Sequence, residues 1–370
     1  MKKTIAVLEG DGIGPEIMAE AEKALEAITK AFGHEFNLIH ADFGGVALEK
    51  YGEPFPKLTK NACDKADAIL KGPVGGPKYD SIKELELKPE VGGVLGLRKR
   101  YRTFANLRPL LLLQPLWFLS PLKQQLVQKG VDILMVRELI GGIYFGKKKR
   151  LAKKGVMHAI DTMEYSEKQI EMIARVAFKE ALKRKKIVHN IHKANVLECS
   201  RLWNETVENI WKKEFPSLTV EHMLVDNAAY QLTINPCQFD VMLMENMMGD
   251  ILSDLGGGII GSLGLMPSAC IGEKKAYYEP AHGSAPDIAG KGVANPFSMI
   301  GSAALMLEKS FGMKKEADIV WNSMFKIMKN GYFTHDLYKQ AKANGIVCKQ
   351  VSTTEFGDLV AQTITSLHNE

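Results

Sequence analysis

The chain has 370 residues, of which 46% are hydrophobic and 25% are charged, and its formal net charge is +5. This composition is typical of a globular protein with room for two domains, and it excludes the disordered and fibrous classes. The small positive charge does not require nucleic acid as a partner, but it suits an anionic substrate.

The cysteines and the N-terminus indicate the compartment. Five cysteines are scattered without a CxxC pair, which is typical of reduced thiols and predicts a cytoplasmic protein. Glu9 and Asp11 interrupt the N-terminal apolar run, so we expect no signal peptide. No uncharged apolar stretch approaches the ~20 residues of a membrane span, so we expect no membrane contact.

The chain opens with a strand, a turn and a helix. Residues 4–8 show a buried-strand pattern, residues 10–14 form a glycine-rich turn, and Pro15 is suited to the first helical position. The turn resembles a dinucleotide fingerprint, but the sixth position of GxGxxG is Pro15. A turn before a helix explains the glycines, so we expect no Rossmann fold here.

Similar units follow along the chain. Ser166 and Gln169 have the spacing of a capping box at the start of a helix. The alternation of strands and helices predicts an α/β architecture with a largely parallel sheet. Further strands are predicted at residues 68–71, 131–136, 186–190 and 239–244. The lysine-rich residues 147–154 contain no aromatic residue, so a solvated loop is favoured over a nucleic-acid surface.

Three arginines are candidate anion ligands. Arg98 and Arg108 flank the stretch KRYRTFANL, and Arg137 directly follows the strand VDILMV. Guanidinium groups bind carboxylates through two parallel hydrogen bonds. Arg100 and Arg102 are equally basic, and residue type alone does not rank them below the other arginines.

Two aspartates lie one turn apart. Asp250 and Asp254 occur in the helical pattern MENMMGDILSDLGGGIIGSLG, so their carboxylates share one face. A hard divalent cation such as Mg²⁺ or Mn²⁺ would relieve their repulsion. On this segment alone, two solvated acids on an exposed helix are the favoured explanation, and the other motifs of the chain shift the balance toward a cation site.

A Gly- and Pro-rich segment at residues 278–296, YEPAHGSAPDIAGKGVANP, contains no strand or helix pattern. Long loops inside compact domains are usually functional. We expect His282, Gly283, Ser284 and Asp287 to surround an adenosine. A carboxylate at Asp287 would accept hydrogen bonds from the ribose hydroxyls and repel a 2′-phosphate, which favours NAD over NADP.

Together these motifs resemble the β-decarboxylating dehydrogenases, the isocitrate/isopropylmalate dehydrogenase family. The resemblance covers nearly the whole chain in family order. It implies two α/β domains around a cleft, the first at residues 1–103 plus 261–370 and the central one at residues 104–260. It also implies a homodimer with shared active sites. The matching segments are residues 10–16, 72–80, 97–109, 136–146, 193–197, 225–232, 249–254 and 278–296.

The resemblance also implies roles for individual residues. Lys193 and Tyr144 would be the acid/base pair, and Asp226 would complete the metal site of the partner subunit and approach the substrate. Asn195 would face the nicotinamide. The remaining NAD contacts implied for the loop are Glu279, Ala285, Ile288 and Asn295.

The implied reaction is NAD-dependent oxidative decarboxylation of a 2-hydroxy dicarboxylate. Val94 and Leu95 precede the first arginine and would suit an isopropyl group, which favours 3-isopropylmalate and leucine biosynthesis. No serine occurs between Ile82 and Arg98 to pair with the extra carboxylate of isocitrate. D-malate, tartrate and homoisocitrate stay open, and a non-catalytic regulatory subunit is disfavoured because the implied catalytic residues are present.

Several positions depart from the family pattern, among them three glycines at residues 256–258 where alanines are more usual. Ile140 replaces a usual threonine, His192 replaces a usual aspartate, and Gly93 looks like an extra residue in the substrate loop. The extra residue would shift the register of the segment that carries Val94 and Leu95.

Overall fold

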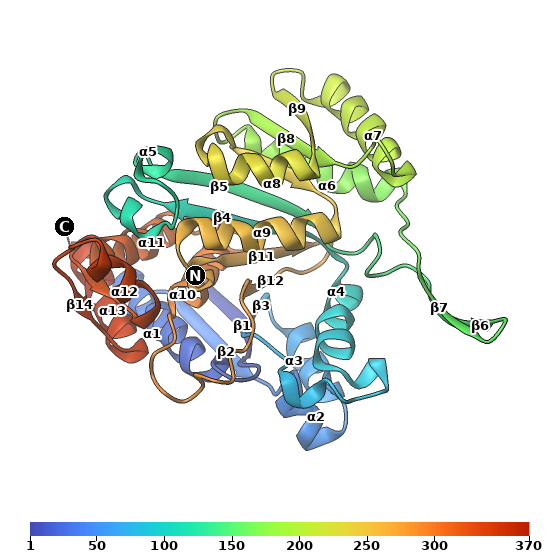
Figure 1. Cartoon of the computed structure of the whole chain (residues 1–370). Helices are drawn as coiled ribbons and strands as arrows, with labels where there is room; N and C mark the ends of the chain where they lie inside the picture. The colour runs from blue at the N-terminus through green and yellow to red at the C-terminus, as the bar shows by residue number, and fades with distance from the viewer. Residues whose placement is uncertain (370) are drawn as a thin grey trace.

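The computed structural model describes residues 1–369. Within them, ten strands form one mixed sheet in the order β2-β1-β3-β12-β11-β4-β5-β10-β8-β9 (Figure 1). The strands of this sheet are β1 (Lys2–Leu8), β2 (Glu35–His40), β3 (Ala68–Lys71), β4 (Thr103–Leu112), β5 (Val131–Glu138), β8 (Ile187–His192), β9 (Thr219–Leu224), β10 (Val241–Met244), β11 (Pro267–Gly272) and β12 (Tyr277–Pro280).

The centre of the sheet is antiparallel, which corrects part of the sequence prediction. The neighbours on either side pair in parallel, but β12–β11, β11–β4 and β4–β5 are antiparallel pairs. The parallel groups β2-β1-β3-β12 and β5-β10-β8-β9 therefore run in opposite directions, and the antiparallel strands β11 and β4 lie between them. Hydrophobic pattern identifies strands but does not contain the direction of their neighbours.

Helices cover both halves of the sheet. α1 packs against α10 and α13 beside the N-terminal strands, and α6 and α9 pack against β4 and β5. The helices are α1 (Gly14–Phe32), α2 (Gly45–Tyr51), α3 (Lys57–Lys65), α4 (Gly96–Tyr101), α5 (Gln124–Val127), α6 (Glu167–Ala181), α7 (Glu198–Glu214), α8 (Val225–Ile234), α9 (Asn246–Ile260), α10 (Phe297–Lys309), α11 (Lys314–Lys329), α12 (His335–Ala343) and α13 (Thr353–Asn369).

Several local predictions are confirmed. The N-terminal strand is present, α1 begins at Gly14, one residue before the predicted Pro15, and β3 spans the predicted residues 68–71. Ser166 caps α6, where its side chain and that of Gln169 exchange hydrogen bonds with backbone N–H groups. Such caps are formed by residues close in sequence, which is why spacing predicts them.

Two loop predictions are wrong in part. Most of the lysine-rich segment forms β6 (Lys148–Lys153), which pairs with β7 (Val156–Asp161) in a hairpin that projects from the body of the molecule (Figure 1). The segment is exposed, as predicted, but it is a strand. The loop at residues 278–296 begins within β12 instead of following it. In both cases pairing with a partner strand overrides a weak local pattern.

The remaining elements are minor. β13 (Tyr332–Phe333) and β14 (Lys349–Gln350) form a short parallel pair. Among residues 1–369, no helix combines the length and apolarity that a membrane crossing requires. The division into domains at residues 103/104 and 260/261 stays a prediction.

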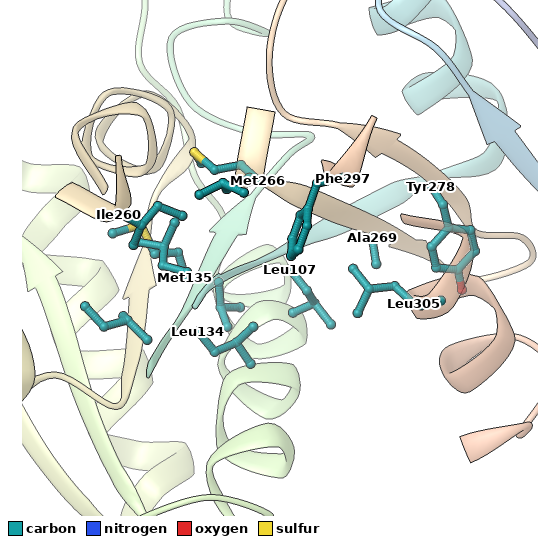
Figure 2. Close-up of a cluster of buried hydrophobic side chains, with 14 of the residues drawn as sticks. Leu107, Leu134, Met135, Ile260, Met266, Ala269, Tyr278, Phe297 and Leu305 are labelled. Carbon is teal, nitrogen blue, oxygen red and sulfur yellow. The ribbon is translucent and has the colours of Figure 1, made fainter. Parts of the chain in front are cut away.

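The core joins the two halves through the central strands (Figure 2). Leu107 of β4 is 2% exposed and lies opposite Ala269 of β11 and Val136 of β5. Figure 2 shows it among side chains from both sides of the sheet centre, including Leu134, Ala269 and Phe297. The packing of β4 therefore holds the two halves in one body.

We predict that Leu107→Ala lowers the free energy of unfolding by about 2–5 kcal/mol, because it removes buried methyl groups and leaves a cavity. Leu58→Ala is the matched control, since Leu58 is 66% exposed on α3 and its loss should change stability by less than about 0.5 kcal/mol. Urea unfolding followed by circular dichroism measures both. Equal losses would contradict the central role of β4.

Candidate functional site

The three predicted arginines lie together in one cavity of about 280 Å³. Arg98 comes from α4, Arg108 from β4 and Arg137 from β5, and their exposures are 7%, 5% and 2%. Arg100 instead pairs with Asp64 at the surface. The structure thus distinguishes the three arginines of the cavity from the surface Arg100, a distinction that residue type alone does not make.

The register of the sheet explains how the site assembles. Asn106 and Arg108 are two apart on β4, so they point to one face, and Arg137 lies opposite Asn106 on β5. Glu279 of β12 and Lys71 of β3 reach the same cavity. The site therefore lies on one face across the antiparallel centre of the sheet. Arg137, one residue from the end of β5, is also near the strand terminus where the sequence predicts a ligand contact.

Electrostatics make this cavity attractive to anions. Burial, together with the charges of Arg108 and Arg98, lowers the pKa of Arg137 to about 10. Arg108 donates to Asn106 at 2.6 Å and to Ser253 at 2.6 Å. A ligand with carboxylates would neutralise this repulsion and provide bidentate acceptors.

Asp250 and Asp254 approach these arginines from α9. Asp250 bonds to Arg137, and Asp254 lies 3.4 Å from Arg108. Burial raises the pKa of Asp254, and the charge of Asp250 raises it further. The two neighbouring carboxylates therefore favour additional positive charge. Their oxygen atoms are ligands of the kind that a hard divalent cation prefers.

One chain does not complete a metal site by itself. Within residues 1–369, no three His, Cys, Asp or Glu side chains are close enough to hold a metal ion. Asp250 and Asp254 would need a further ligand from solvent, from substrate or from another chain.

Tyr144 lies beside Asp250 of α9. Its hydroxyl donates to Asp250 at 2.9 Å, and it lines the cavity with Val94 and Leu95. Burial raises the pKa of Tyr144, and the negative charge of Asp250 adds to this effect. The phenol is therefore held in its protonated form, which is the form that can donate a proton.

Lys193 and Asp226 lie outside this cavity. Their side chains form an ion pair at 2.5 Å, in which the Asp226 side chain is 63% exposed. The hydrogen bond from Lys193 lowers the pKa of Asp226. Asn195 is exposed nearby. The structure of one chain thus brings these predicted residues together with each other but not with the arginines.

A second pocket of about 410 Å³ lies beside the predicted nucleotide loop. His282 and Gly283 line both this pocket and the arginine cavity, which connects the two. Burial lowers the pKa of His282 and keeps its ring neutral. The other predicted residues that line the second pocket are Ala285, Ile288 and Asn295.

Ser284 and Asp287 are placed differently. The Ser284 hydroxyl donates to the Gly75 carbonyl at 2.7 Å, and the Ser284 carbonyl accepts from Ile13 at 2.8 Å. Ser284 therefore fastens the loop to the N-terminal turn. Asp287 lines a neighbouring hollow with Asp11 instead of the 410 Å³ pocket.

Sequence reasoning missed Lys71 and Glu90, which both line the arginine cavity. Lys71 is 1% exposed and forms an ion pair with Glu279 at 2.5 Å. Burial would raise the pKa of Glu279, but the charges of Lys71 and Arg98 outweigh it and lower that pKa. A lysine at the end of the buried strand ILK was the available signal, since buried lysines need a partner.

The chain directly before α4 forms a helical coil that is wider than an α-helix. Residues Pro89–Leu95 form a π-helical stretch, and such stretches hold one more residue per turn than an α-helix. This geometry accommodates Gly93 within the coil, where it is buried. Val94 and Leu95 consequently face the cavity as predicted.

Comparisons with known proteins identify the family. The model of the isocitrate/isopropylmalate dehydrogenase family matches residues 4–360. A 3-isopropylmalate dehydrogenase from Wolinella succinogenes is 50% identical, covering 98% of both chains. One from Thermotoga maritima is 46% identical, covering 97% of this chain and 98% of the relative.

The fold agrees with solved structures. An isocitrate dehydrogenase from Methylococcus capsulatus superimposes with a TM-score of 0.84 at 31% identity, covering 98% of this chain and 99% of the other. This likeness and the family match confirm the α/β fold inferred from the sequence motifs. The chain belongs to the isocitrate/isopropylmalate dehydrogenase family.

Proposed function

We propose that this protein catalyses the NAD-dependent oxidative decarboxylation of 3-isopropylmalate to 4-methyl-2-oxopentanoate, a step of leucine biosynthesis. The observation that carries the proposal is one cavity with three buried arginines facing an apolar wall. Arginines bind the two carboxylates, and the wall accepts the isopropyl group. The wall is formed by Val74, Val91, Val94 and Leu95.

The names of the relatives support this substrate over other 2-hydroxy acids. Isocitrate would place a third carboxylate against the apolar wall, which is costly without a polar partner. D-malate and tartrate would leave that wall without a hydrocarbon group to contact. Homoisocitrate would again bring a charged group there.

We propose NAD as the cofactor, bound across the second pocket next to the substrate cavity. The pocket holds an adenosine between Ile288, Asn295 and the loop at Gly283, all of which line it. Asp287 lines the neighbouring hollow, directly before Ile288 of this pocket, and we propose that its carboxylate accepts hydrogen bonds from the ribose hydroxyls. Bound NAD supplies the acceptor for the hydride from C2 of the substrate.

We further propose a homodimer in which each site takes residues from both chains. Tyr230 and Ile234 on α8, and Ile251 on α9, are large apolar side chains exposed in one chain. The hairpin β6–β7 exposes Val156 and Met157 in the same way. Apolar surfaces of this kind mark protein interfaces.

In that dimer, Asp250 and Asp254 of one chain and Asp226 of the partner subunit would hold Mg²⁺ or Mn²⁺. A bound cation would supply Lewis acidity toward the C2 hydroxyl and its neighbouring carboxylate. The exposed pair of Lys193 and Asp226 is then placed over the other chain's cavity, which also lies between the two predicted domains. Free cysteines support a cytoplasmic enzyme.

The residues divide the chemistry between them. Lys193 of the partner subunit accepts the C2 hydroxyl proton while the hydride leaves C2, which gives a 2-keto acid. The bond from C3 to its carboxylate then breaks and CO₂ leaves. Tyr144 donates a proton to C3, and the arginines keep both carboxylates oriented throughout.

The function is tested by NADH formation with purified protein, NAD⁺ and Mg²⁺. We predict that kcat/KM for 3-isopropylmalate exceeds that for D-malate, tartrate, isocitrate or homoisocitrate by at least about tenfold, because one or two methyl groups contribute that much in an apolar pocket. Lys193→Ala should abolish turnover, while Lys213→Ala, an exposed lysine on α7, should not. A preference for another acid would refute the substrate, and inactivity with all five would refute the enzyme.

We predict that Asp287→Lys raises KM for NAD⁺ by about tenfold or more, since one lost charged hydrogen bond is worth about that factor. KM for the malate substrate should stay the same. Glu205→Lys on α7 is exposed and makes the same charge change far along the chain, so it serves as the control. Unchanged KM for NAD⁺ would remove Asp287 from the cofactor site.

Shared sites predict complementation between inactive chains. A heterodimer of Lys193→Ala and Asp250→Asn, purified through two different tags, has one intact site and should show about half of wild-type activity. A heterodimer of Lys193→Ala and Asp226→Asn should stay inactive, because each site then receives one defect from its partner. Recovery in both pairs, or in neither, would contradict the shared arrangement.

A further inference from the structure

A buried acidic cluster lies directly behind the proposed site. It consists of Glu138, Tyr165, Glu245 and Asn246, whose exposures are 0%, 7%, 3% and 0%. The Tyr165 hydroxyl lies 3.1 Å from Glu245 and 3.3 Å from Glu138, and it accepts the backbone N–H of Asn246 at 3.0 Å. Two carboxylates therefore converge on one phenol away from solvent.

The cluster contacts the loop that carries Tyr144. Glu138 accepts the backbone N–H groups of Ile140 at 2.7 Å and Gly141 at 2.9 Å. The Gly141 carbonyl accepts from the Asn246 side chain at 3.1 Å. A side chain at Gly141 would collide with the Tyr165 ring, 2.5 Å from the added carbon. The path of this loop is therefore determined by the cluster.

The same cluster holds Arg137 and α9. The Asn246 side-chain oxygen accepts from Arg137 at 2.8 Å and 3.2 Å. Glu245 caps α9 by accepting the N–H groups of Met247 and Met248. The charged carboxylate is favoured at this helix N-terminus. A substrate arginine, the loop with Tyr144 and the helix with Asp250 thus meet at one point.

Hydrogen bonding shows where a proton is needed. Tyr165 has one proton to donate, so it cannot donate to both carboxylates at once. If Tyr165 donates to Glu245, the contact with Glu138 requires a proton on Glu138. Burial raises the pKa of Glu138 to about 7, and the negative charge of Glu245 contributes to the rise.

The other charged group near Glu138 does not replace this proton. Arg137 precedes Glu138 on β5, but its guanidinium bonds to Asp250 and Asn246 in the cavity. Burial and the charges of Glu138 and Glu245 raise the pKa of Tyr165 far above its ordinary value, so the phenol keeps its proton. The cluster is then stable with one negative charge rather than two.

We propose that Glu138 and Tyr165 are positioning residues for the decarboxylation, and that Glu138 and Glu245 share one carboxyl proton across the Tyr165 hydroxyl, which holds Arg137, the Tyr144 loop and α9 in place. The proposal rests on the proposed function for its kinetic consequences. Its structural part, the protonated cluster and the held loop, stands independently of the substrate.

The kinetic test compares Glu138→Gln, Glu138→Ala and Tyr165→Phe. Glutamine keeps the volume and can donate to Tyr165, but it loses one of the two acceptors for the loop; alanine loses both. We expect kcat to fall and KM for the malate substrate to rise, by on the order of 10-fold to 100-fold for alanine and less for glutamine. Tyr165→Phe should resemble alanine, and KM for NAD⁺ should change little in all three variants.

Asp240→Asn is the matched control. Asp240 is a fully buried carboxylate that directly precedes β10, at the opposite end of that strand from Glu245, and it pairs with Arg184 at 2.8 Å. Its loss should lower stability without changing kcat or either KM. If Glu138→Ala lowered stability but left kcat and KM for the malate substrate unchanged, the positioning role would be refuted.

The shared proton is tested by stability against pH. A carboxyl whose folded pKa is about 7 binds more protons folded than unfolded between its unfolded pKa and 7. Its contribution to stability is therefore present at low pH and falls as pH rises through that window. The wild-type free energy of unfolding should fall relative to Glu138→Gln between pH 5 and pH 8. A constant difference would refute the proton on Glu138.

Hydrogen exchange separates this proposal from the proposed function. Peptides covering residues 139–146 should exchange faster in Glu138→Ala and Tyr165→Phe than in the wild type, and at the wild-type rate in Asp240→Asn. If the variants exchange faster as expected but the wild type is inactive with 3-isopropylmalate, the proposed function is refuted and the proposal about the cluster is supported. An active wild type with unchanged exchange in the variants would refute the cluster alone.

Discussion

Three buried guanidinium groups repel one another at the centre of the cavity, and the surrounding polypeptide is arranged to compensate that repulsion. Glu279 lies within 4.0 Å of Arg98, Asp250 bonds to Arg137, and Asp254 approaches Arg108. Two of these acidic groups have a further partner, because Lys71 pairs with Glu279 and Tyr144 donates to Asp250. A dicarboxylate ligand would relieve the remaining repulsion, which links the stability of the site to its occupancy.

The reversal of direction at the centre of the sheet makes this arrangement possible. Across this centre, Lys71 of β3, Glu279 of β12, Arg108 of β4 and Arg137 of β5 all line one cavity on one face of the sheet. α9 covers that face at β4 and β5 and brings its two aspartates to the arginines. The opposite side of β4 packs into the shared core at Leu107 (Figure 2). Strand direction, core packing and site geometry therefore depend on the same element.

The surface around α8 is the part of the chain that we propose to form the dimer contact. Lys193 and Asp226, for which we propose roles at the cavity of a second chain, form an ion pair at the surface, and Asp226 lies on α8 with the exposed apolar side chains of Tyr230 and Ile234. A dimer would bury the apolar side chains and place the charged pair over a second cavity. Under this proposal catalysis and assembly would be coupled, because each site would take reacting groups from both chains.

The amino-acid sequence by itself determined the local features and the family. The capping box at Ser166, the helix start near Pro15 and the strand at residues 68–71 depend on neighbours in sequence, so spacing predicts them. The motif order also identified the arginines and the aspartates that the structure brings together. The roles of Tyr144 and Lys193 came from resemblance, since a tyrosine and a lysine have no distinctive spacing.

Only the tertiary structure decided which of several similar residues share the site. It buries Arg98 in the cavity but leaves Arg100 paired with Asp64 at the surface. It pairs Lys71 with Glu279, which is more than 200 residues away in the chain. It also places β4 between two antiparallel neighbours. These outcomes depend on pairing between segments distant in the chain. Local pattern carries no information about them, because the free energy that selects them comes from burial and partner charges that exist only after folding.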